Sequence, residues 1–472
     1  MKDIGKGTDD ERQTRLHVVH VAVVLLALIG VLALYICYLQ TFGAEKLAHH
    51  PLNQRSAQAE MEIQRGSLLD AKGRALAQST APGQRSYPMG AAMAPVTGYI
   101  GERIGSAGLE GRENQALLGR TDEMNRLGPV TQLLQSDRGN DVHTTINADV
   151  QQAAYDAFAG RRGAAVVLDA TTGAVLAMVS CPSYDPARVE DDWDSLREQA
   201  DGPLLNRVLY GMYPPGSTIK PMMADAALAA SVTNTTETFD CDGVLDVGGG
   251  QSIREAHGEV HGTVNLEQAV TESCNVTFGQ LAVRMGAKKL GDAFERFGFT
   301  KELTGDLASE AAHLPDFGVL GKGDTAQVGI GQSSLLVTPM EMALVAAAFA
   351  NGGVVMQPYL VQSVTTPSGL TIREARPEKW FEATTPERAA LIDGYMESVV
   401  TRGTGTAARV SGIRVTGKTG TAENAQGKDH AWFIGSADVG GRKIAFAIIV
   451  ENSGGGGIEA APIAKKIVLS ME

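Results

Sequence analysis

A serine followed three residues later by a lysine is the first candidate for chemistry in this sequence. Ser217 and Lys220 lie in the segment 213–221, where a Pro-Pro-Gly run hinders an earlier helix and favours one that begins at Ser217. Helix positions three apart share one face. A serine hydroxyl becomes a nucleophile when a base takes its proton, and lysine is such a base once burial or a nearby cation lowers its pKa. The pair predicts nucleophilic catalysis, although Ser-x-x-Lys alone is common by chance.

A second candidate group is Ser273-Cys274-Asn275, which lies within a helical pattern that runs over residues 266–285. Ser273 and Asn275 are expected to point toward a site, and Cys274 toward the core. A hydroxyl and an amide can pass on protons and hold a peptide, but a group this short is weak evidence by itself.

The third group is Lys418-Thr419-Gly420, in a segment 417–423 that precedes a predicted pair of strands. A strand of this composition beside a nucleophile offers a cation, a hydroxyl and a glycine that lets a substrate backbone approach closely. Lys418 is also expected to keep Lys220 neutral by repulsion between like charges. Together, the three groups indicate one shared site.

The order Ser-x-x-Lys, Ser-x-Asn, Lys-Thr-Gly resembles the signature of penicillin-binding proteins and class A β-lactamases. The surrounding residues resemble class B penicillin-binding proteins, the monofunctional transpeptidases, over about residues 60–450. The segments that carry this resemblance beyond the three motifs are 65–73, 108–110, 163–180, 329–339, 350–353 and 403–405.

The resemblance implies a D,D-transpeptidase that cross-links peptidoglycan stem peptides through an acyl-serine. A D-Ala-D-Ala peptide would acylate the serine and release D-alanine, and an amine from a neighbouring strand would then attack the ester. β-Lactams would inhibit the enzyme covalently. The resemblance implies that the enzyme uses no cofactor and no metal. The implied catalytic residues are Ser217 as nucleophile, Lys220 as base, Ser273 as proton relay and Asn275 as peptide holder; the implied substrate-binding residues are Lys418, Thr419, Gly420 and Thr421, and the N–H groups of Ser217 and Thr421 would form the oxyanion hole.

An apolar stretch near the N-terminus predicts a membrane anchor. Val18 to Leu39 is close to the ~20 residues that span a bilayer and longer than the core of a signal peptide. Lys and Arg residues precede the stretch more densely than they follow it, which favours a cytoplasmic N-terminus and an exported remainder. In the resembled class, the anchor and the next domain contact a multi-pass glycan polymerase of the SEDS type, which is the expected partner.

The rest of the chain predicts two regions of α+β type. Residues 45–137 read as a small, irregular, β-rich pedestal, and residues 138–472 as the transpeptidase domain, after a cytoplasmic tail at 1–17 and the anchor at 18–39. Strands are predicted at 163–168, 174–179, 431–437 and 443–450, with helices between them at 222–230, 266–285 and 339–350. Strands at both ends of this region favour a central antiparallel sheet flanked by helices. The glycine run 454–457 is interpreted as a flexible loop.

Other features exclude functions. The formal net charge of −13 argues against nucleic-acid binding. Cys181, Cys241 and Cys274 lack metal-type spacing and are interpreted as buried thiols, with a Cys181–Cys241 bond left open. His257 and His261 lack the His-Glu-x-x-His order of zinc proteases and lie among glycines, so a metal site there is not expected.

Two alternatives to the transpeptidase remain. The same fold with water as acceptor would be a D,D-carboxypeptidase or a β-lactamase, and a chain that binds without turnover would be a β-lactam sensor or a scaffold. The sequence does not separate roles in division, elongation or sporulation.

Overall fold

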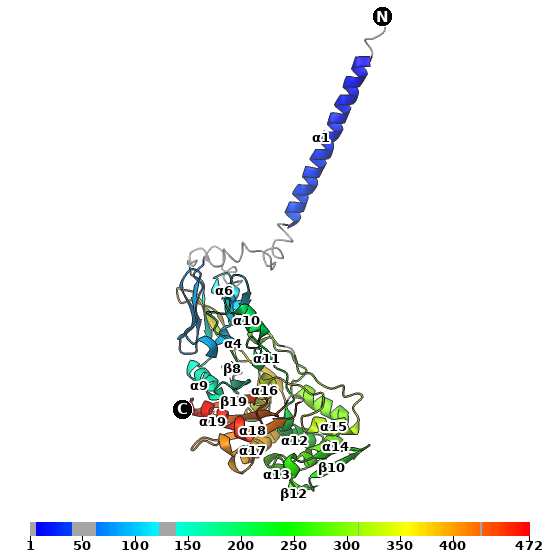
Figure 1. The fold of residues 1–472 in the computed structure, drawn as a ribbon, viewed down its shortest axis with the longest axis vertical. Helices are drawn as coiled ribbons and strands as arrows, with labels where there is room; N and C mark the ends of the chain where they lie inside the picture. Colours follow the sequence, from blue (N-terminus) through cyan, green and yellow to red (C-terminus); the bar gives the residue numbers. More distant parts are fainter. Residues whose placement is uncertain (1–5, 40–62, 122–137, 310, 425–426) are drawn as a thin grey trace. The chain divides into compact units, whose positions relative to one another are not determined.

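The computed structural model describes residues 6–39, 63–121, 138–309, 311–424 and 427–472 (Figure 1). The chain divides into two compact units, residues 1–62 and 63–472. In the described part of the first unit, residues 6–39, the chain forms the long helix α1 (Lys6–Tyr38). Within α1, Gln13–Tyr38 is long and apolar enough to cross a membrane. The predicted anchor at 18–39 is therefore the apolar part of a longer helix.

A five-stranded sheet forms the centre of the second unit. Its strands run in the order β17-β18-β19-β7-β8, and every neighbouring pair is antiparallel. The α+β prediction with a central antiparallel sheet is confirmed. Its strands are β7 (Gly163–Asp169), β8 (Val175–Cys181), β17 (Val415–Ala422), β18 (His430–Val439) and β19 (Arg442–Val450).

Helices cover both faces of this sheet, which explains why its strands are apolar runs without alternation. One face packs on α16 and the helices beyond it, and the other on α9 and α19. Asn147 caps α9 through its side chain, as predicted. The larger helices are α9 (Ala148–Phe158), α12 (Lys220–Ala229), α13 (Leu266–Thr271), α14 (Asn275–Arg296), α15 (Lys322–Gly329), α16 (Pro339–Ala350), α17 (Pro386–Arg402) and α19 (Ala461–Leu469).

A second, six-stranded sheet lies in the region that includes the predicted pedestal. Its order is β15-β14-β6-β1-β2-β3. Three of its strands come from the part of the chain assigned to the transpeptidase domain, so the predicted boundary at residue 138 falls between strands that share one sheet. The strands are β1 (Leu68–Leu69), β2 (Ala75–Ala81), β3 (Gln84–Ser86), β6 (Asp141–Thr144), β14 (Val361–Thr365) and β15 (Thr371–Glu374).

Smaller strand pairs lie outside the two main sheets, and two of them, β9 with β12 and β10 with β11, lie in the chain between α12 and α13. The four strands are β9 (Thr238–Cys241), β10 (Val244–Gly248), β11 (Gln251–Arg254) and β12 (Gly262–Asn265).

The helix predicted over 266–285 is not continuous. α13 ends at Thr271 and α14 begins at Asn275, and the intervening Ser273 has φ 64°, which lies outside the right-handed helical region. The predicted helix is therefore wrong at the second motif, and the break gives that motif its geometry.

Candidate active site

Ser217 lies on a short 3₁₀ turn, η3 (Gly216–Ile219), which continues directly into α12. Gly216 has φ 53°, and its N–H donates to the Gly331 carbonyl at 2.9 Å. A Cβ on Gly216 would lie 2.8 Å from the Thr421 carbonyl oxygen, so only glycine lets the serine turn approach β17 this closely.

Lys220 is the first residue of α12 and is completely buried. Its Nζ donates to Asn275 Oδ1 at 2.7 Å, to Ser273 Oγ at 3.2 Å and to the Ser273 carbonyl oxygen. Burial lowers the pKa of Lys220 to about 8, although the nearby carboxylate of Glu255 acts in the opposite direction. The first two motifs therefore meet at one amine, which is held by three acceptors and loses its proton more readily than an ordinary lysine.

The loop between α13 and α14 positions the second motif. Cys274 is fully buried and caps α14 by accepting the Thr277 N–H at its Sγ. Its neighbours Ser273 and Asn275 both turn to Lys220. The predicted division of the motif, with polar side chains toward the site and Cys274 toward the core, is confirmed.

Lys418 lies on β17 and is also completely buried, with Nζ donating to the Thr419 carbonyl oxygen at 3.0 Å. Burial and the positive charge of Lys220 lower its pKa well below the ordinary value of a lysine. The repulsion expected between the two lysines is thus present, and it acts on Lys418. Each of the two lysines disfavours the protonated, charged form of the other.

Strand β17 packs directly on the serine turn. A Cβ on Gly420 would lie 2.8 Å from Thr218 Cγ2 and 3.1 Å from the Pro215 carbonyl oxygen, so this glycine also marks a close approach. With Thr421 against Gly216, the structure brings all eight predicted site residues to one region.

Two contributors were missed by sequence reasoning. Thr404 Oγ1 lies 2.5 Å from Thr419 Oγ1, and its segment 403–405 was noted only as a matching stretch. Glu255 accepts the Asn275 N–H at 2.9 Å and the Val276 N–H at 2.7 Å, and no local pattern marks it.

The glycine run 454–457 differs from its prediction. Gly456 begins the short helix α18 (Gly456–Glu459), and a Cβ there would lie 2.5 Å from the Gly420 carbonyl oxygen. The second half of the run is therefore packed against the third motif and is not a flexible loop.

Comparison with known proteins places this site in a family. Residues 163–469 match the family model of the penicillin-binding protein transpeptidase domain. The chain belongs to the class B penicillin-binding proteins. In this transpeptidase, residues 65–142 match the penicillin-binding protein A dimerisation domain.

Curated relatives and solved structures agree with the match. The transpeptidase is 34% identical to the peptidoglycan D,D-transpeptidase PbpA of Mycolicibacterium smegmatis, over 95% of this chain and 97% of that protein. It is 32% identical to the peptidoglycan D,D-transpeptidase MrdA of Acinetobacter baumannii, over 81% of this chain and 65% of that protein. Penicillin-binding protein A of Mycobacterium tuberculosis, solved as a ceftriaxone acyl-enzyme, superposes with a TM-score of 0.81 at 32% identity, covering 88% of this chain and 99% of that one.

Proposed function

We propose that this chain is a peptidoglycan D,D-transpeptidase in which Ser217 carries the acyl group. The observation that supports this most directly is the amine of Lys220, fully buried and held by Ser273 and Asn275, one helical turn from the serine. Membership of the penicillin-binding protein family supports the same reaction.

In the acylation step, Lys220 in its neutral form takes the proton of Ser217 Oγ as the oxygen attacks the carbonyl of a D-Ala-D-Ala peptide. The negative charge on the tetrahedral intermediate is stabilised by the backbone N–H groups of Ser217 and Thr421, and such donors contribute about 3 kcal/mol each to catalysis. Ser273 passes the proton from Lys220 to the departing D-alanine nitrogen. An acceptor amine then attacks the ester carbonyl and gives its proton to Lys220, and this proton passes to Ser217 Oγ as the amide bond forms and the ester bond breaks.

The negative charge of the substrate also affects the two lysines of the site. The terminal carboxylate of the peptide, or of a β-lactam, binds Lys418 and the hydroxyl of Thr419. This anion raises the pKa of Lys418, and the ammonium it stabilises keeps Lys220 neutral by repulsion. Binding of the correct substrate therefore favours the protonation state in which Lys220 acts as a base. Asn275 holds the peptide, and Gly420 lets its backbone approach β17.

The nucleophile is tested with purified full-length protein and a fluorescent penicillin. The wild type should form a covalent adduct visible in a denaturing gel and by intact mass, and Ser217→Ala should form none. Ser368→Ala, at an exposed serine, is the matched control and should label like the wild type. Labelling of Ser217→Ala at the wild-type rate would contradict the assignment.

The acceptor is tested with a stem-peptide analogue and a D-amino acid. A transpeptidase exchanges the terminal D-alanine for the added D-amino acid and keeps its penicilloyl adduct for many minutes. Rapid hydrolysis of the adduct without exchange would assign the site to a β-lactamase, and release of D-alanine without exchange would assign it to a carboxypeptidase.

Orientation and partner belong to the same proposal. The N-terminus lies in the cytoplasm and the catalytic unit outside, since basic residues concentrate before the apolar segment of α1. Protease added to intact spheroplasts should digest the catalytic unit.

The partner is a SEDS-type glycan polymerase that contacts the anchor and the pedestal. Pull-down of the polymerase should fail when residues 1–60 are replaced by an unrelated membrane helix; retention of the polymerase would argue against this contact.

A further inference from the structure

A buried carboxylate that the proposed reaction does not use is linked to the segment that leads into the serine turn. Glu451 follows the last residue of β19, and its side chain is only 6% exposed. Its Oε1 accepts the hydroxyl of Tyr213 and Nε of Arg207, each at 2.7 Å. Its Oε2 lies 2.7 Å from a guanidinium nitrogen of Arg162. Three donors therefore converge on one carboxylate.

These contacts determine the protonation states of the carboxylate and the phenol. Burial acts to raise the pKa of Glu451, but the hydrogen bonds from Tyr213 and Arg207 outweigh it and hold this pKa below its ordinary value. Burial and the charge of Glu451 raise the pKa of Tyr213. The phenol is therefore protonated and donates to an ionised carboxylate, and hydrogen bonds of this kind are about twice as strong as neutral ones.

Glu451 closes the segment that precedes the nucleophile. Arg207 begins the short helix α11 (Arg207–Tyr210), and Tyr213 directly precedes the Pro-Pro-Gly run. Because Oε1 accepts from both residues, a single oxygen ties the two ends of this segment together. The Tyr213 backbone is held as well, since it exchanges two hydrogen bonds of 3.0 and 2.9 Å with the backbone of Val337. The entry of the chain into the serine turn is therefore fixed through both the side chain and the backbone of Tyr213.

The ring of Tyr213 lies against the strand that pairs with Thr421. It makes edge contacts with His430 and Trp432 of β18, at centroid distances of 5.5 and 6.1 Å. Trp432 Nε1 also donates to the Pro214 carbonyl at 3.0 Å. The residue of β18 between the two aromatic side chains lies opposite Thr421 of β17. Tyr213 therefore joins the serine turn to the stretch of sheet that carries the Thr421 N–H.

We propose that Glu451 is a positioning residue for acylation, which holds the phenol of Tyr213 and thereby fixes Ser217 relative to the Thr421 N–H. This role rests on the proposed function, in which Ser217 is the nucleophile and this N–H is part of the oxyanion hole. Such donors stabilise the intermediate when they lie about 2.7–3.1 Å from the position of its oxyanion. A displaced serine turn therefore slows acylation more than it weakens the binding of the substrate.

The same carboxylate also joins segments of the fold, so its removal alone would not separate positioning from stability. Arg162 immediately precedes β7, and its carbonyl accepts the Glu451 N–H at 2.8 Å. Glu451→Ala would leave two guanidinium groups without their carboxylate, which strongly destabilises a buried ion pair. Tyr213→Phe removes only the hydrogen bond of the phenol and leaves Glu451 paired with both arginines.

The first test compares Tyr213→Phe with the wild type in full-length protein purified in detergent. Stopped-flow acylation by a fluorescent penicillin, over a range of concentrations, separates the noncovalent dissociation constant from the acylation rate constant. Tyr213→Phe should lower the acylation rate constant about tenfold and leave the dissociation constant within about twofold of the wild type.

Tyr184→Phe is the matched control. Tyr184 is 8% exposed, against 7% for Tyr213, and its hydroxyl lies 3.5 Å from the Ala94 carbonyl oxygen. Its ring packs on Tyr99, in a cluster apart from the serine turn. Both constants should be unchanged in this variant. An acylation rate constant of folded Tyr213→Phe within about twofold of the wild type, or an equal loss in Tyr184→Phe, would overturn the positioning role.

The second test asks whether Tyr213 acts through Glu451. Glu451→Asp keeps the negative charge for the arginines but draws the carboxylate back from the phenol, so it should also slow acylation. Adding Tyr213→Phe to this variant should slow it by less than about twofold more, because the phenol has already lost its acceptor. A further tenfold loss in the double variant would overturn the assignment to Glu451.

The lifetime of the penicilloyl adduct is a readout that a loss of stability alone would not move. Hydrolysis of the adduct passes through a second tetrahedral intermediate at the same N–H groups, so Tyr213→Phe should lengthen the lifetime about tenfold at temperatures well below its thermal midpoint. An unchanged lifetime would contradict a displaced oxyanion hole.

Ser217→Ala separates this result from the proposed function. Labelling of Ser217→Ala would contradict the nucleophile, whatever the tyrosine variants show. Loss of labelling in Ser217→Ala together with wild-type kinetics in Tyr213→Phe would contradict the positioning role alone.

Discussion

The lowered pKa of Lys220 predicts how the rate of acylation depends on pH. An ordinary lysine, with a pKa of 10.5, is neutral in only about 0.03% of molecules at pH 7; lowering the pKa to about 8 raises that fraction to about 9%. Burial therefore increases the population of the active base about 300-fold, which corresponds to about 3.4 kcal/mol. Because the neutral amine is the reactive form, acylation should accelerate about tenfold between pH 7 and pH 9 and level off above that.

The assay is the second-order rate of acylation by a fluorescent penicillin, measured under pseudo-first-order conditions from pH 5.5 to 10. Thermal unfolding at each pH separates loss of structure from loss of reactivity. Asn275→Asp places a carboxylate oxygen where Asn275 Oδ1 now lies, 2.7 Å from the amine, and should shift the inflection to higher pH. A rate that is independent of pH across this range, in protein that stays folded, would refute a neutral lysine as the base.

Two further changes test the packing around the site. Gly216→Ala introduces a Cβ 2.8 Å from the Thr421 carbonyl oxygen and should lower the acylation rate about 100-fold through displacement of the serine turn, whereas Gly249→Ala, also at positive φ but in open space, should leave it unchanged. Equal rates for both variants would show that the close approach does not matter. Asp225→Ala removes a fully buried carboxylate that pairs with two arginines and should lower the free energy of unfolding by about 3 kcal/mol in urea denaturation. Asp292→Ala, which breaks an exposed pair, should cost less than about 0.5 kcal/mol, and similar losses for the two aspartates would contradict the role of burial.

Features encoded in local sequence were predictable. The central strands β7 and β19 could be located because strands buried on both faces are continuous apolar runs. The three motifs could be assigned to one site because Lys220 and Ser217 share one turn, and because the Lys418 strand precedes the predicted strand pair. The helix cap at Asn147 follows from its side chain alone.

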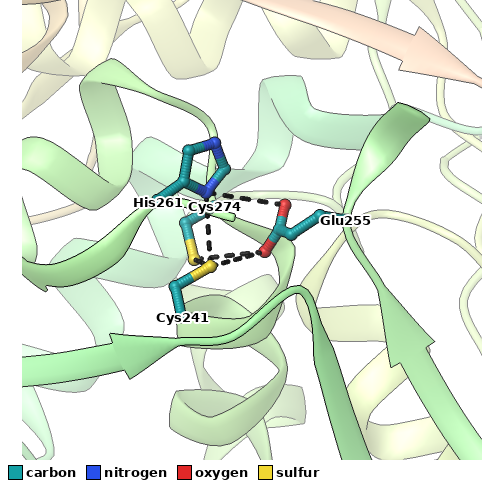
Figure 2. A group of neighbouring side chains, drawn as sticks. All are labelled: Cys241, Glu255, His261 and Cys274. Carbon is teal, nitrogen blue, oxygen red and sulfur yellow. Dashed lines mark hydrogen bonds and ion pairs between the residues drawn. The ribbon is translucent and has the colours of Figure 1, made fainter. Parts of the chain in front are cut away.

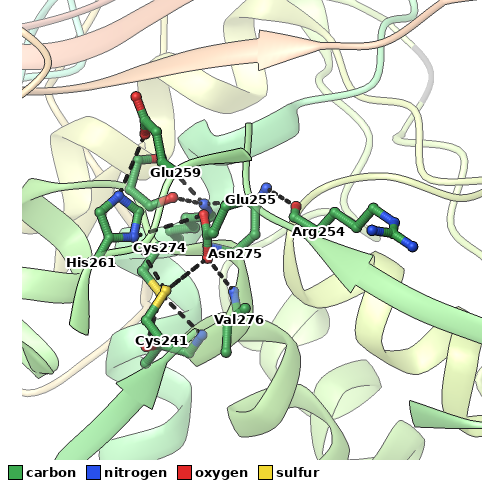
Figure 3. A network of polar contacts seen from close by, with 11 residues as sticks. Cys241, Arg254, Glu255, Glu259, His261, Cys274, Asn275 and Val276 are labelled. Atoms are coloured by element: carbon green, nitrogen blue, oxygen red, sulfur yellow. Dashed lines mark hydrogen bonds and ion pairs between the residues drawn. The ribbon is translucent and has the colours of Figure 1, made fainter. Parts of the chain in front are cut away.

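Features that depend on contacts between distant parts of the chain could not be predicted from the sequence. No glycine or proline lies within five residues of Ser273, so neither of these helix breakers marks the break in the local sequence. It exists because Glu255, far back in the sequence, accepts the Asn275 and Val276 N–H groups at the new helix start. For the same reason the contact between His261 and Cys241 was missed (Figure 2): His261 was considered only with His257, although its Nδ1 lies 3.2 Å from Cys241 Sγ, within the polar network that includes Asn275 (Figure 3).

The pairing order of the central sheet has a consequence for the newly made chain. Strand β7 emerges early and pairs at once with β8, but its other edge is filled by β19, with Asp169 opposite Ile444. Contacts this distant in sequence form slowly, and an apolar strand edge left open in the meantime can associate with other chains. The enzyme should therefore depend on a chaperone during biogenesis, and a nascent chain stalled before Arg442 should be highly sensitive to proteases.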